Sequence, residues 1–200
     1  MSSGNESGPR PGGKRERTRA ALVAAALEVV AEKGFAAASL DEIAARAGMT
    51  KGAIYSNFSG KAELLLAAMG ARGLAMTAPR APAATIDEEL AAMATELGQV
   101  VRRARAEEAL IAEFNLYALS DAETRKGLAA TYAEGFTGTA GYLAALKGRS
   151  GAMSPRHLAV ALQCIAMGFM VQSLVTPDEV TDAVIRETLQ ALARGLAADR

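Results

Sequence analysis

The residue types that most often carry catalysis are scarce in this 200-residue chain. It contains one histidine, His157, and one cysteine, Cys164, so it lacks the residues for an internal disulfide or a His/Cys metal cluster. No Gly-rich phosphate loop and no nucleophile with a matching base appear in the sequence. The acidic residues Glu107, Glu108 and Glu113 lack a companion histidine for a di-metal site. We therefore expect no enzyme, no cofactor and no metal.

Side chains suited to nucleic-acid binding cluster instead in the segment AASLDEIAARAGMTKGAIYSNF, residues 37–58. The pattern predicts two short helices, the first capped by Ser39, that meet at Gly48, where a sharp turn favours glycine. In the second helix Ile54 and Phe58 are expected to face inward. The remaining side chains would form a small, polar and basic face that suits a DNA major groove. This face comprises Thr50, Lys51, Gly52, Ala53, Tyr55, Ser56 and Asn57.

Each residue type on this face has a matching contact on DNA. Gly52 and Ala53 permit close approach, and the Ala53 methyl group can touch a thymine methyl. Thr50 and Tyr55 can donate to phosphates, and Asn57 can bond a base edge or the backbone. The alternative is a two-helix corner that simply packs. The sequence favours a helix-turn-helix that contacts DNA.

A basic segment lies upstream of this motif, and its charge is offset only by Glu16. It could follow phosphates or enter a minor groove, the alternative being a solvated tail and helix face. Residues 1–61 carry 9 basic and 6 acidic groups, a balance of +3, whereas residues 62–200 carry 13 and 16, a balance of −3. This asymmetry is compatible with DNA binding at the N-terminal end. The basic residues are Arg10, Lys14, Arg15, Arg17 and Arg19.

Composition and capping patterns predict an all-α fold. Half of the residues are apolar, 4% are aromatic and tryptophan is absent, which favours closely packed helices over sheets. Pro155 and Pro177 are expected in first helical turns. Four Ser or Thr residues precede a Glu by three positions, as at helix starts: Ser39/Glu42, Thr85/Glu88, Ser120/Glu123 and Thr176/Glu179. We expect about nine helices, at roughly 15–33, 40–47, 51–57, 60–76, 86–104, 107–118, 121–146, 155–175 and 178–198.

The segment GFAAASLDEIAARAGMTKGAIYSNFSGKAELLLAAM resembles the N-terminal domain of the tetracycline-repressor (TetR) family, and the resemblance extends over Arg15 to Met69. It implies that the third helix reads the major groove. Thr50 and Lys51 would approach the DNA backbone, Ala53 the bases, and Tyr55 and Lys61 phosphates. Asn57 stands where many members have His, and Ala53 where many have Thr or Ser, which affects the base preference. Arg15, Arg17 and Ser39 complete the predicted DNA-binding set.

The C-terminal helices predict a dimer. The helix at 155–175 is apolar on more than one side, so one side can meet its own core and another a partner. With the last helix it could form a four-helix interface, as the resemblance also implies, although burial inside a monomer is the alternative. A membrane span at Leu158–Val175 is disfavoured by interrupting polar residues and absent aromatic anchors. The predicted interface comprises Leu158, Leu162, Ile165, Phe169, Val184, Leu189, Leu192 and Leu196.

A small-molecule pocket is implied by the resemblance and is expected between helices of the C-terminal body. Its lining would be largely apolar with a few polar groups, although each residue considered alone is more often a core residue than a ligand contact. The effector would shift helix four and change the separation of the two recognition helices. The candidate lining residues are Phe114, Asn115, Tyr117, Tyr132, Phe136, Gln163, Met167 and Met170.

The predicted organisation is a disordered tail at 1–13, a helix-turn-helix domain at 14–61 and a ligand-binding and dimerisation domain at 62–200, with a loop or kink at 77–85. The predicted function is a cytoplasmic repressor that binds a palindromic operator as a dimer and is released by an unknown small molecule. The alternative is a helical ligand-binding or protein-interaction bundle without DNA binding. Thr50, Lys51, Tyr55 and Lys61 argue against that alternative.

Overall fold

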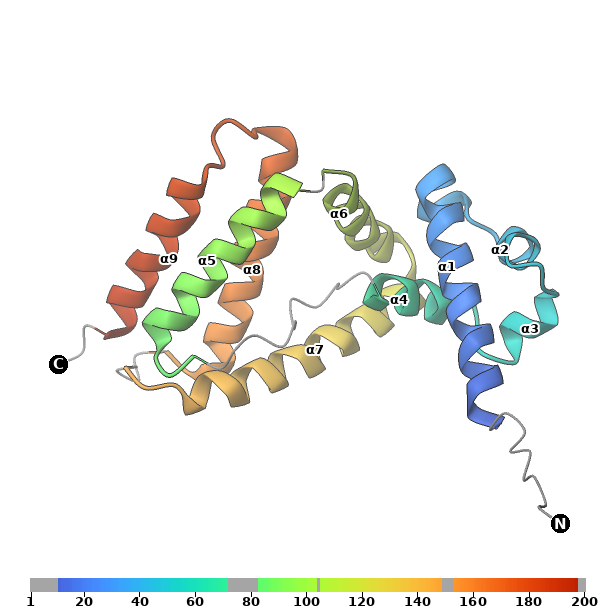
Figure 1. The fold of residues 1–200 in the computed structure, drawn as a ribbon, viewed down its shortest axis with the longest axis horizontal. Coiled ribbons are helices and arrows are strands. Elements are labelled where there is room, and N and C mark those ends of the chain that lie inside the picture. The colour runs from blue at the N-terminus through green and yellow to red at the C-terminus, as the bar shows by residue number, and fades with distance from the viewer. Residues whose placement is uncertain (1–10, 72–82, 104, 149–152, 198–200) are drawn as a thin grey trace, which may run out of the picture. The chain divides into compact units, whose positions relative to one another are not determined.

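The computed structural model describes residues 11–71, 83–103, 105–148 and 153–197, which form nine helices and no strand (Figure 1). The predicted all-α fold is confirmed. Residues 1–10 of the predicted tail lie outside the described residues, and so do residues 77–82 of the predicted loop at 77–85. The helices are α1 (Pro11–Ala37), α2 (Leu40–Arg46), α3 (Lys51–Tyr55), α4 (Lys61–Ala71), α5 (Ile86–Arg103), α6 (Arg105–Ser120), α7 (Ala122–Ala145), α8 (Pro155–Val175) and α9 (Asp182–Ala197).

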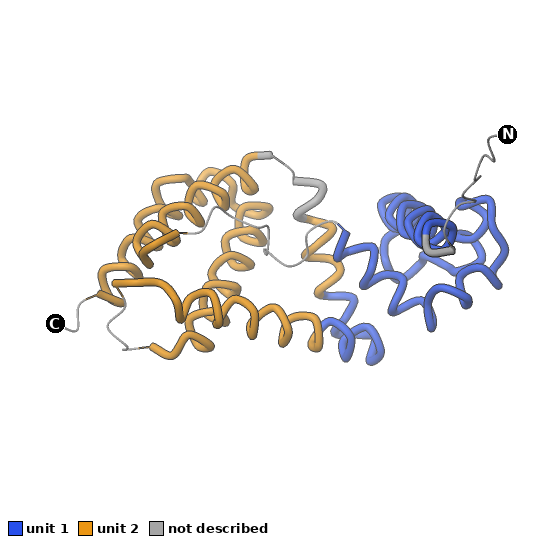
Figure 2. Tube along the Cα trace, turned by 60° about the horizontal axis from the view of Figure 1, so that its bottom comes forward, with its two compact units in different colours: residues 1–74, 116–128 blue, residues 75–115, 129–200 orange. Residues whose placement is uncertain are grey.

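The chain divides into two compact units (Figure 2). Unit 1 contains α1 to α4 together with Leu116–Leu128, the segment where α6 ends and α7 begins. Unit 2 contains α5, α8 and α9 with the remaining parts of α6 and α7. The predicted domain division after residue 61 separates α4 from the helix-turn-helix, whereas the compact unit includes α4.

Two glycines set the path of the chain through unit 1. Gly34 interrupts α1 with φ 77° and ψ 168°, which explains why helical spacing in the sequence stops at residue 33. Gly48 has φ 65°, the left-handed conformation expected for the sharp turn between α2 and α3. At the N-terminal end α1 begins at Pro11, so residues 11–13 are helical and the predicted tail is too long there.

Three predicted helix starts are confirmed by their hydrogen bonds. The Ser39 hydroxyl accepts from the Glu42 amide at 3.2 Å, and the Ser154 hydroxyl accepts from the His157 amide at 3.1 Å. Thr85 and Glu88 form a reciprocal pair: the Thr85 hydroxyl accepts from the Glu88 amide at 3.2 Å, and the Glu88 carboxylate accepts from the Thr85 amide at 3.4 Å. These contacts satisfy amides that the first helical turn leaves without partners.

Two other predicted starts are wrong. Asp121, rather than Ser120, caps α7, since its carboxylate accepts from the Thr124 amide at 2.7 Å while the Ser120 hydroxyl donates to the Tyr117 carbonyl. Thr176 ends α8, with its amide donating to the Gln172 carbonyl, so Pro177 lies between helices. Helix α9 therefore begins at Asp182 rather than residue 178. The sequence pattern is misleading here because a Thr or Ser hydroxyl can donate to a carbonyl of the preceding helical turn as readily as it can accept from an amide of the following one.

Unit 2 is organised around an apolar core shared by α5, α7, α8 and α9. Helix α9 packs along α5, as Figure 1 also shows. A parallel bridge between Thr85 and Lys147 joins the entry of α5 to the end of α7. By length and composition α8 could cross a membrane, but one face of it, including Leu158 and Leu162, is buried in this core. That burial supports the predicted packing of α8 within the protein.

The cap of α7 provides a direct test. Replacing Asp121 by Ala should lower the free energy of unfolding by about 1 kcal/mol because the Thr124 amide loses its acceptor. Ser120→Ala is the matched control and should have a much smaller effect. Both are measured by urea denaturation followed by circular dichroism, and a larger loss for Ser120→Ala would contradict the assignment.

Candidate nucleic-acid interface

The short helix α3 separates a buried side from an exposed side. Ile54 is 0% exposed and Phe58, just beyond the helix, is 2% exposed. Lys51, Gly52 and Tyr55 lie on the opposite side, where Tyr55 is 57% exposed. Thr50 and Ser56 are also exposed, and Ala53 is half-buried. The structure thus brings most of the predicted outer face together on one surface of unit 1.

Lys51 on this face is held by a neighbouring carboxylate. Its ammonium group donates to Asp41 of α2 at 2.9 Å. The hydrogen bond and charge of Asp41 raise the pKa of Lys51 above its usual value. Both side chains are exposed, so water screens the pair and another anion can replace Asp41 at small cost.

Asn57 departs from the prediction. The sequence pattern placed its side chain on the outer face, but it is half-buried and its amide nitrogen donates to the Ala53 carbonyl at 2.8 Å. The backbone carbonyl of Asn57 accepts a hydrogen bond from the guanidinium of Arg19 on α1 at 2.6 Å. The side chain therefore closes the end of α3 rather than projecting from it.

Arg19 also departs from its predicted role in a basic DNA-binding segment. Its guanidinium lies 4.0 Å from the centroid of the Phe58 ring and 3.5 Å from the Glu63 carboxylate. Together with its bond to Asn57, these contacts join α1, the end of α3 and α4. Arg15 and Arg17 of the same segment are exposed, and Arg10 lies outside the described residues.

Lys61 at the start of α4 is directed toward other parts of unit 1. Its ammonium donates to the Ala36 carbonyl at 3.2 Å and lies 5.4 Å from the centroid of the Tyr117 ring. Burial lowers the pKa of Lys61, and the nearby Asp121 opposes that effect. Its predicted phosphate contact would require the side chain to leave these partners.

Tyr117 was predicted to line the effector pocket, but it belongs to unit 1. Its ring stacks on Phe35 with centroids 6.0 Å apart. On the same segment, a Cβ added at Gly127 would clash with a methyl carbon of Leu66 on α4, so a larger residue there would require the Leu66 side chain to move. The α6–α7 corner is packed onto the DNA-binding helices through these contacts.

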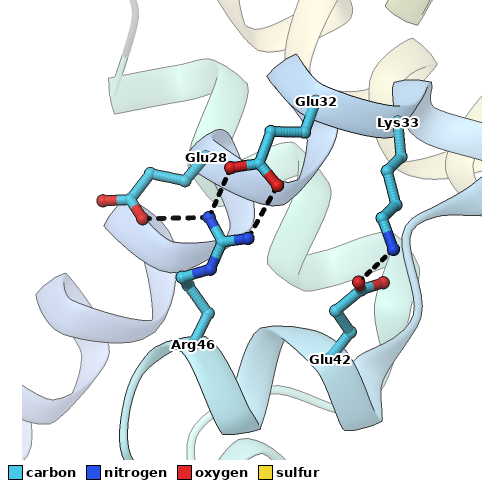
Figure 3. Close-up of polar contacts among 5 residues, drawn as sticks. All are labelled: Glu28, Glu32, Lys33, Glu42 and Arg46. Carbon is cyan, nitrogen blue, oxygen red and sulfur yellow. Dashed lines mark hydrogen bonds and ion pairs between the residues drawn. The ribbon is translucent and has the colours of Figure 1, made fainter.

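An ion-pair network fixes α2 against α1 (Figure 3). Arg46 of α2 donates to both carboxylate oxygens of Glu32, at 2.8 and 2.7 Å, and to Glu28 at 3.3 Å. Lys33 of α1 pairs with Glu42 of α2. The contacts with Arg46 lower the pKa of Glu32. Bidentate geometry restrains the guanidinium more than a single contact would, so the network orients α2.

Within unit 2, two predicted pocket residues are joined by a hydrogen bond. The Tyr132 hydroxyl donates to the Asn115 side-chain oxygen at 3.1 Å, and burial raises the pKa of Tyr132. Tyr132 also stacks on Phe136, with centroids 6.1 Å apart. Arg156 at the start of α8 lies 5.5 Å from the Phe136 centroid. Of the other candidates in this unit, Phe114 and Met170 are buried, and Gln163 and Met167 are half-buried.

The predicted dimer residues divide into two groups. Leu158, Leu162, Leu189 and Leu196 are buried in the core of one chain, so they add little area to any contact between chains. Ile165, Phe169 and Leu192 are half-buried, and Val184 is 43% exposed. The exposed positions on α8 and α9 are instead mostly small residues, which the search for large apolar side chains missed. They include Cys164, Gly168, Val171 and Val175 on α8 and Thr188, Ala191 and Gly195 on α9.

Comparison with known proteins identifies the family of this arrangement. The family described as "Bacterial regulatory proteins, tetR family" matches residues 22–68, which include α2 and α3. The transcriptional regulator SrpR of Pseudomonas putida is 47% identical over 57 residues. Residues 22–68 of this chain therefore match the TetR family. The match with SrpR covers 28% of this chain and 27% of the length of SrpR, so the chain spans about a quarter of that curated relative.

Solved structures resemble this chain over most of its length. Salmonella enterica GusR superposes with a TM-score of 0.71 at 18% identity, covering 95% of this chain and 98% of GusR, which supports the fold. The multidrug binding protein EbrR, in complex with ethidium, gives a TM-score of 0.66 at 29% identity, covering 88% of this chain and 97% of EbrR. The predicted resemblance to the TetR family is therefore confirmed for residues 22–68, and the fold of the chain resembles that of these structures over most of its length.

The position of Arg19 leads to a test that separates structural support from DNA contact. Arg19→Met should lower the free energy of unfolding by about 1 kcal/mol because it removes a hydrogen bond and an ion–ring contact. Arg17→Met, on an exposed turn of the same helix, is the control and should leave stability nearly unchanged. Urea denaturation measures both, and equal losses would contradict the structural role of Arg19.

Proposed function

We propose that this chain is a TetR-family transcriptional repressor that inserts α3 into the major groove of operator DNA. The observation that carries the proposal is the two-sided character of α3. Its apolar side is buried on unit 1, while Thr50, Lys51, Gly52 and Tyr55 remain exposed. A short helix fits the major groove when its outer side chains are small and polar and its apolar side is buried against the rest of the domain. Its site of action would be the cytoplasm, where bacterial chromosomes lie.

The contacts of these residues suggest different roles in DNA binding. Tyr55 has the exposure needed to donate to a phosphate, and Gly52 adds no side chain to hinder approach. Lys51 would exchange Asp41 for a phosphate, which is the stronger partner when the DNA is near. Ala53, half-buried at the edge of the face, would touch a base by its methyl group. Because Asn57 is held by its own helix, base reading would rest less on Asn57 than the sequence suggested.

We propose further that the repressor acts as a two-fold dimer joined through α8 and α9. The exposed positions Gly168 and Val175 on α8, with Ala191 and Gly195 on α9, have small side chains that allow close packing of helices. Val175 is 72% exposed, which leaves an apolar group in water unless a partner covers it. A two-fold dimer would present two copies of α3 to a palindromic operator.

The effector proposal rests on the Tyr132 region of unit 2. The Tyr132 hydroxyl and the Asn115 amide offer polar contacts beside the ring of Phe136, the combination typical of small-molecule sites. The related EbrR is described as a multidrug binding protein and was solved with ethidium, which supports an effector site in this chain. An effector releases DNA only if it binds the two conformations with different affinity, typically by about 1–3 kcal/mol.

The DNA-binding role is tested on duplexes selected from a random pool with the full-length protein. Tyr55→Phe should weaken binding to the selected duplex several-fold because a phosphate contact is lost. Lys51→Gln should lower the slope of log affinity against log salt concentration by about 1. Lys147→Gln, an exposed lysine of unit 2, is the control and should change neither quantity. Unchanged affinity and salt dependence in both α3 variants would overturn the proposed interface.

The dimer is tested by placing a charge on the exposed side of α9. Ala191→Arg should shift the protein from dimer to monomer in analytical ultracentrifugation, because a buried unpaired charge strongly disfavours association. Ala130→Arg, at an exposed position of α7 in the same unit, is the matched control and should remain dimeric. A wild-type monomer at micromolar concentration, or a dimer that survives Ala191→Arg, would contradict this interface.

A further inference from the structure

A groove between α5 and α9 lies within unit 2 and uses none of the residues assigned above to DNA, dimer or effector. Its volume is 260 Å³. The α5 side is lined by Leu90, Ala91, Ala94, Thr95 and Gly98. Ala91 and Thr95 are exposed, whereas Leu90 and Ala94 belong to the core and are 1% and 9% exposed. Three charged residues, Arg102, Asp182 and Arg186, also line the groove.

An ion pair joins two of these charged residues. Arg102 of α5 donates to the Asp182 carboxylate at the start of α9. Gly98 lies beside this pair, so a Cβ there would lie 2.7 Å from an Asp182 carboxylate oxygen and would require that side chain to move. This ion pair neutralises the charge of Asp182, so Asp182 is not available to pair with Arg186, the next cation along α9.

Arg186 lies one helical turn after Asp182. No ion pair or hydrogen bond of its side chain is found in the part of the chain that the structure describes, and the side chain is exposed at the groove. Gln190, a further turn along, also borders the groove. With Arg102, Asp182 and Arg186 counted together, the groove carries a net charge of +1 beside an apolar surface.

We propose that this groove binds a small organic carboxylate with an apolar body, such as a single aromatic ring. The planar guanidinium of Arg186 can donate two parallel hydrogen bonds to a carboxylate, and Gln190 can add a third. The ring would lie on Ala91 and on the small exposed edges of Leu90 and Ala94. At 260 Å³ the groove is smaller than the roughly 300–1,000 Å³ of sites for drug-sized ligands, which limits the occupant to about one ring.

Both parts of the ligand are required by this geometry. Inorganic phosphate would meet Arg186 but leave the apolar surface exposed to water. An uncharged or cationic ring would cover that surface but give Arg186 no partner. The site is therefore distinct in chemistry and position from the effector region around Tyr132, and it does not depend on the proposed repressor function.

The probe for this site is benzoate, titrated into the full-length ¹⁵N-labelled protein and followed by amide chemical shifts. We expect saturable shifts at α5 and α9, with Arg186→Gln weakening binding at least tenfold. Arg194→Gln, an exposed arginine on the same helix but outside the groove, is the matched control and should bind benzoate as the wild type does.

A second variant and two further probes complete the test. Gly98→Ala should weaken benzoate binding, because it adds a Cβ at the groove and moves the Asp182 carboxylate that borders it, and circular dichroism verifies that the helix is retained. Benzylamine and inorganic phosphate should each bind at least tenfold more weakly than benzoate. The proposal is overturned if benzoate produces no saturable shifts, if Arg186→Gln binds it unchanged, or if benzylamine binds equally well.

Discussion

The burial of Ile54 and Phe58 beneath α3 is the interaction on which the DNA-binding surface depends. A helix of five residues is too short to persist in water, because its few hydrogen bonds do not offset the entropy of fixing the chain. Its conformation therefore comes from packing on unit 1. The same packing turns Lys51, Gly52 and Tyr55 outward as a group. A change under α3 would thus disturb DNA binding without touching any residue that meets DNA.

Charged side chains in unit 1 serve largely to hold helices in place. Arg46 links α2 to two glutamates of α1, and Arg19 links α1 to the end of α3 and to α4. These pairs are exposed, so each contributes little to overall stability. Their geometric effect is larger, since a planar guanidinium with several acceptors restrains the helices that carry them. In the N-terminal basic segment, Arg19 therefore supports the packing of the helices, whereas the charged side chains of Arg15 and Arg17 are exposed.

Unit 2 uses its large and small apolar residues differently. The leucines of α8 and α9 fill the core of the single chain, where each gains stability by removal from water. Some small residues of the same helices, including Gly168, Ala191 and Gly195, remain at the surface, whereas Ala159, Ala166 and Ala193 lie in the core. Small side chains expose little apolar area in the isolated chain yet allow two helices to approach closely. This division supports an interface between chains that differs from the leucine-rich one expected from hydrophobicity.

The sequence by itself determined the features that local chemistry controls. Helical spacing and the absence of strand patterns predicted the all-α fold, Gly48 marked the turn, and Ser39 and Thr85 marked helix starts. The resemblance over Arg15 to Met69 predicted the family match because residues 22–68 carry the family's residue pattern. Only the tertiary structure decided which groups are already occupied by distant partners. Arg19 meets Phe58, Asn57 closes its own helix, Tyr117 packs on Phe35, and Leu189 lies in the core. The spacing of apolar residues predicts which face of a helix a side chain lies on. What that face contacts is decided by packing between helices that are far apart in the sequence.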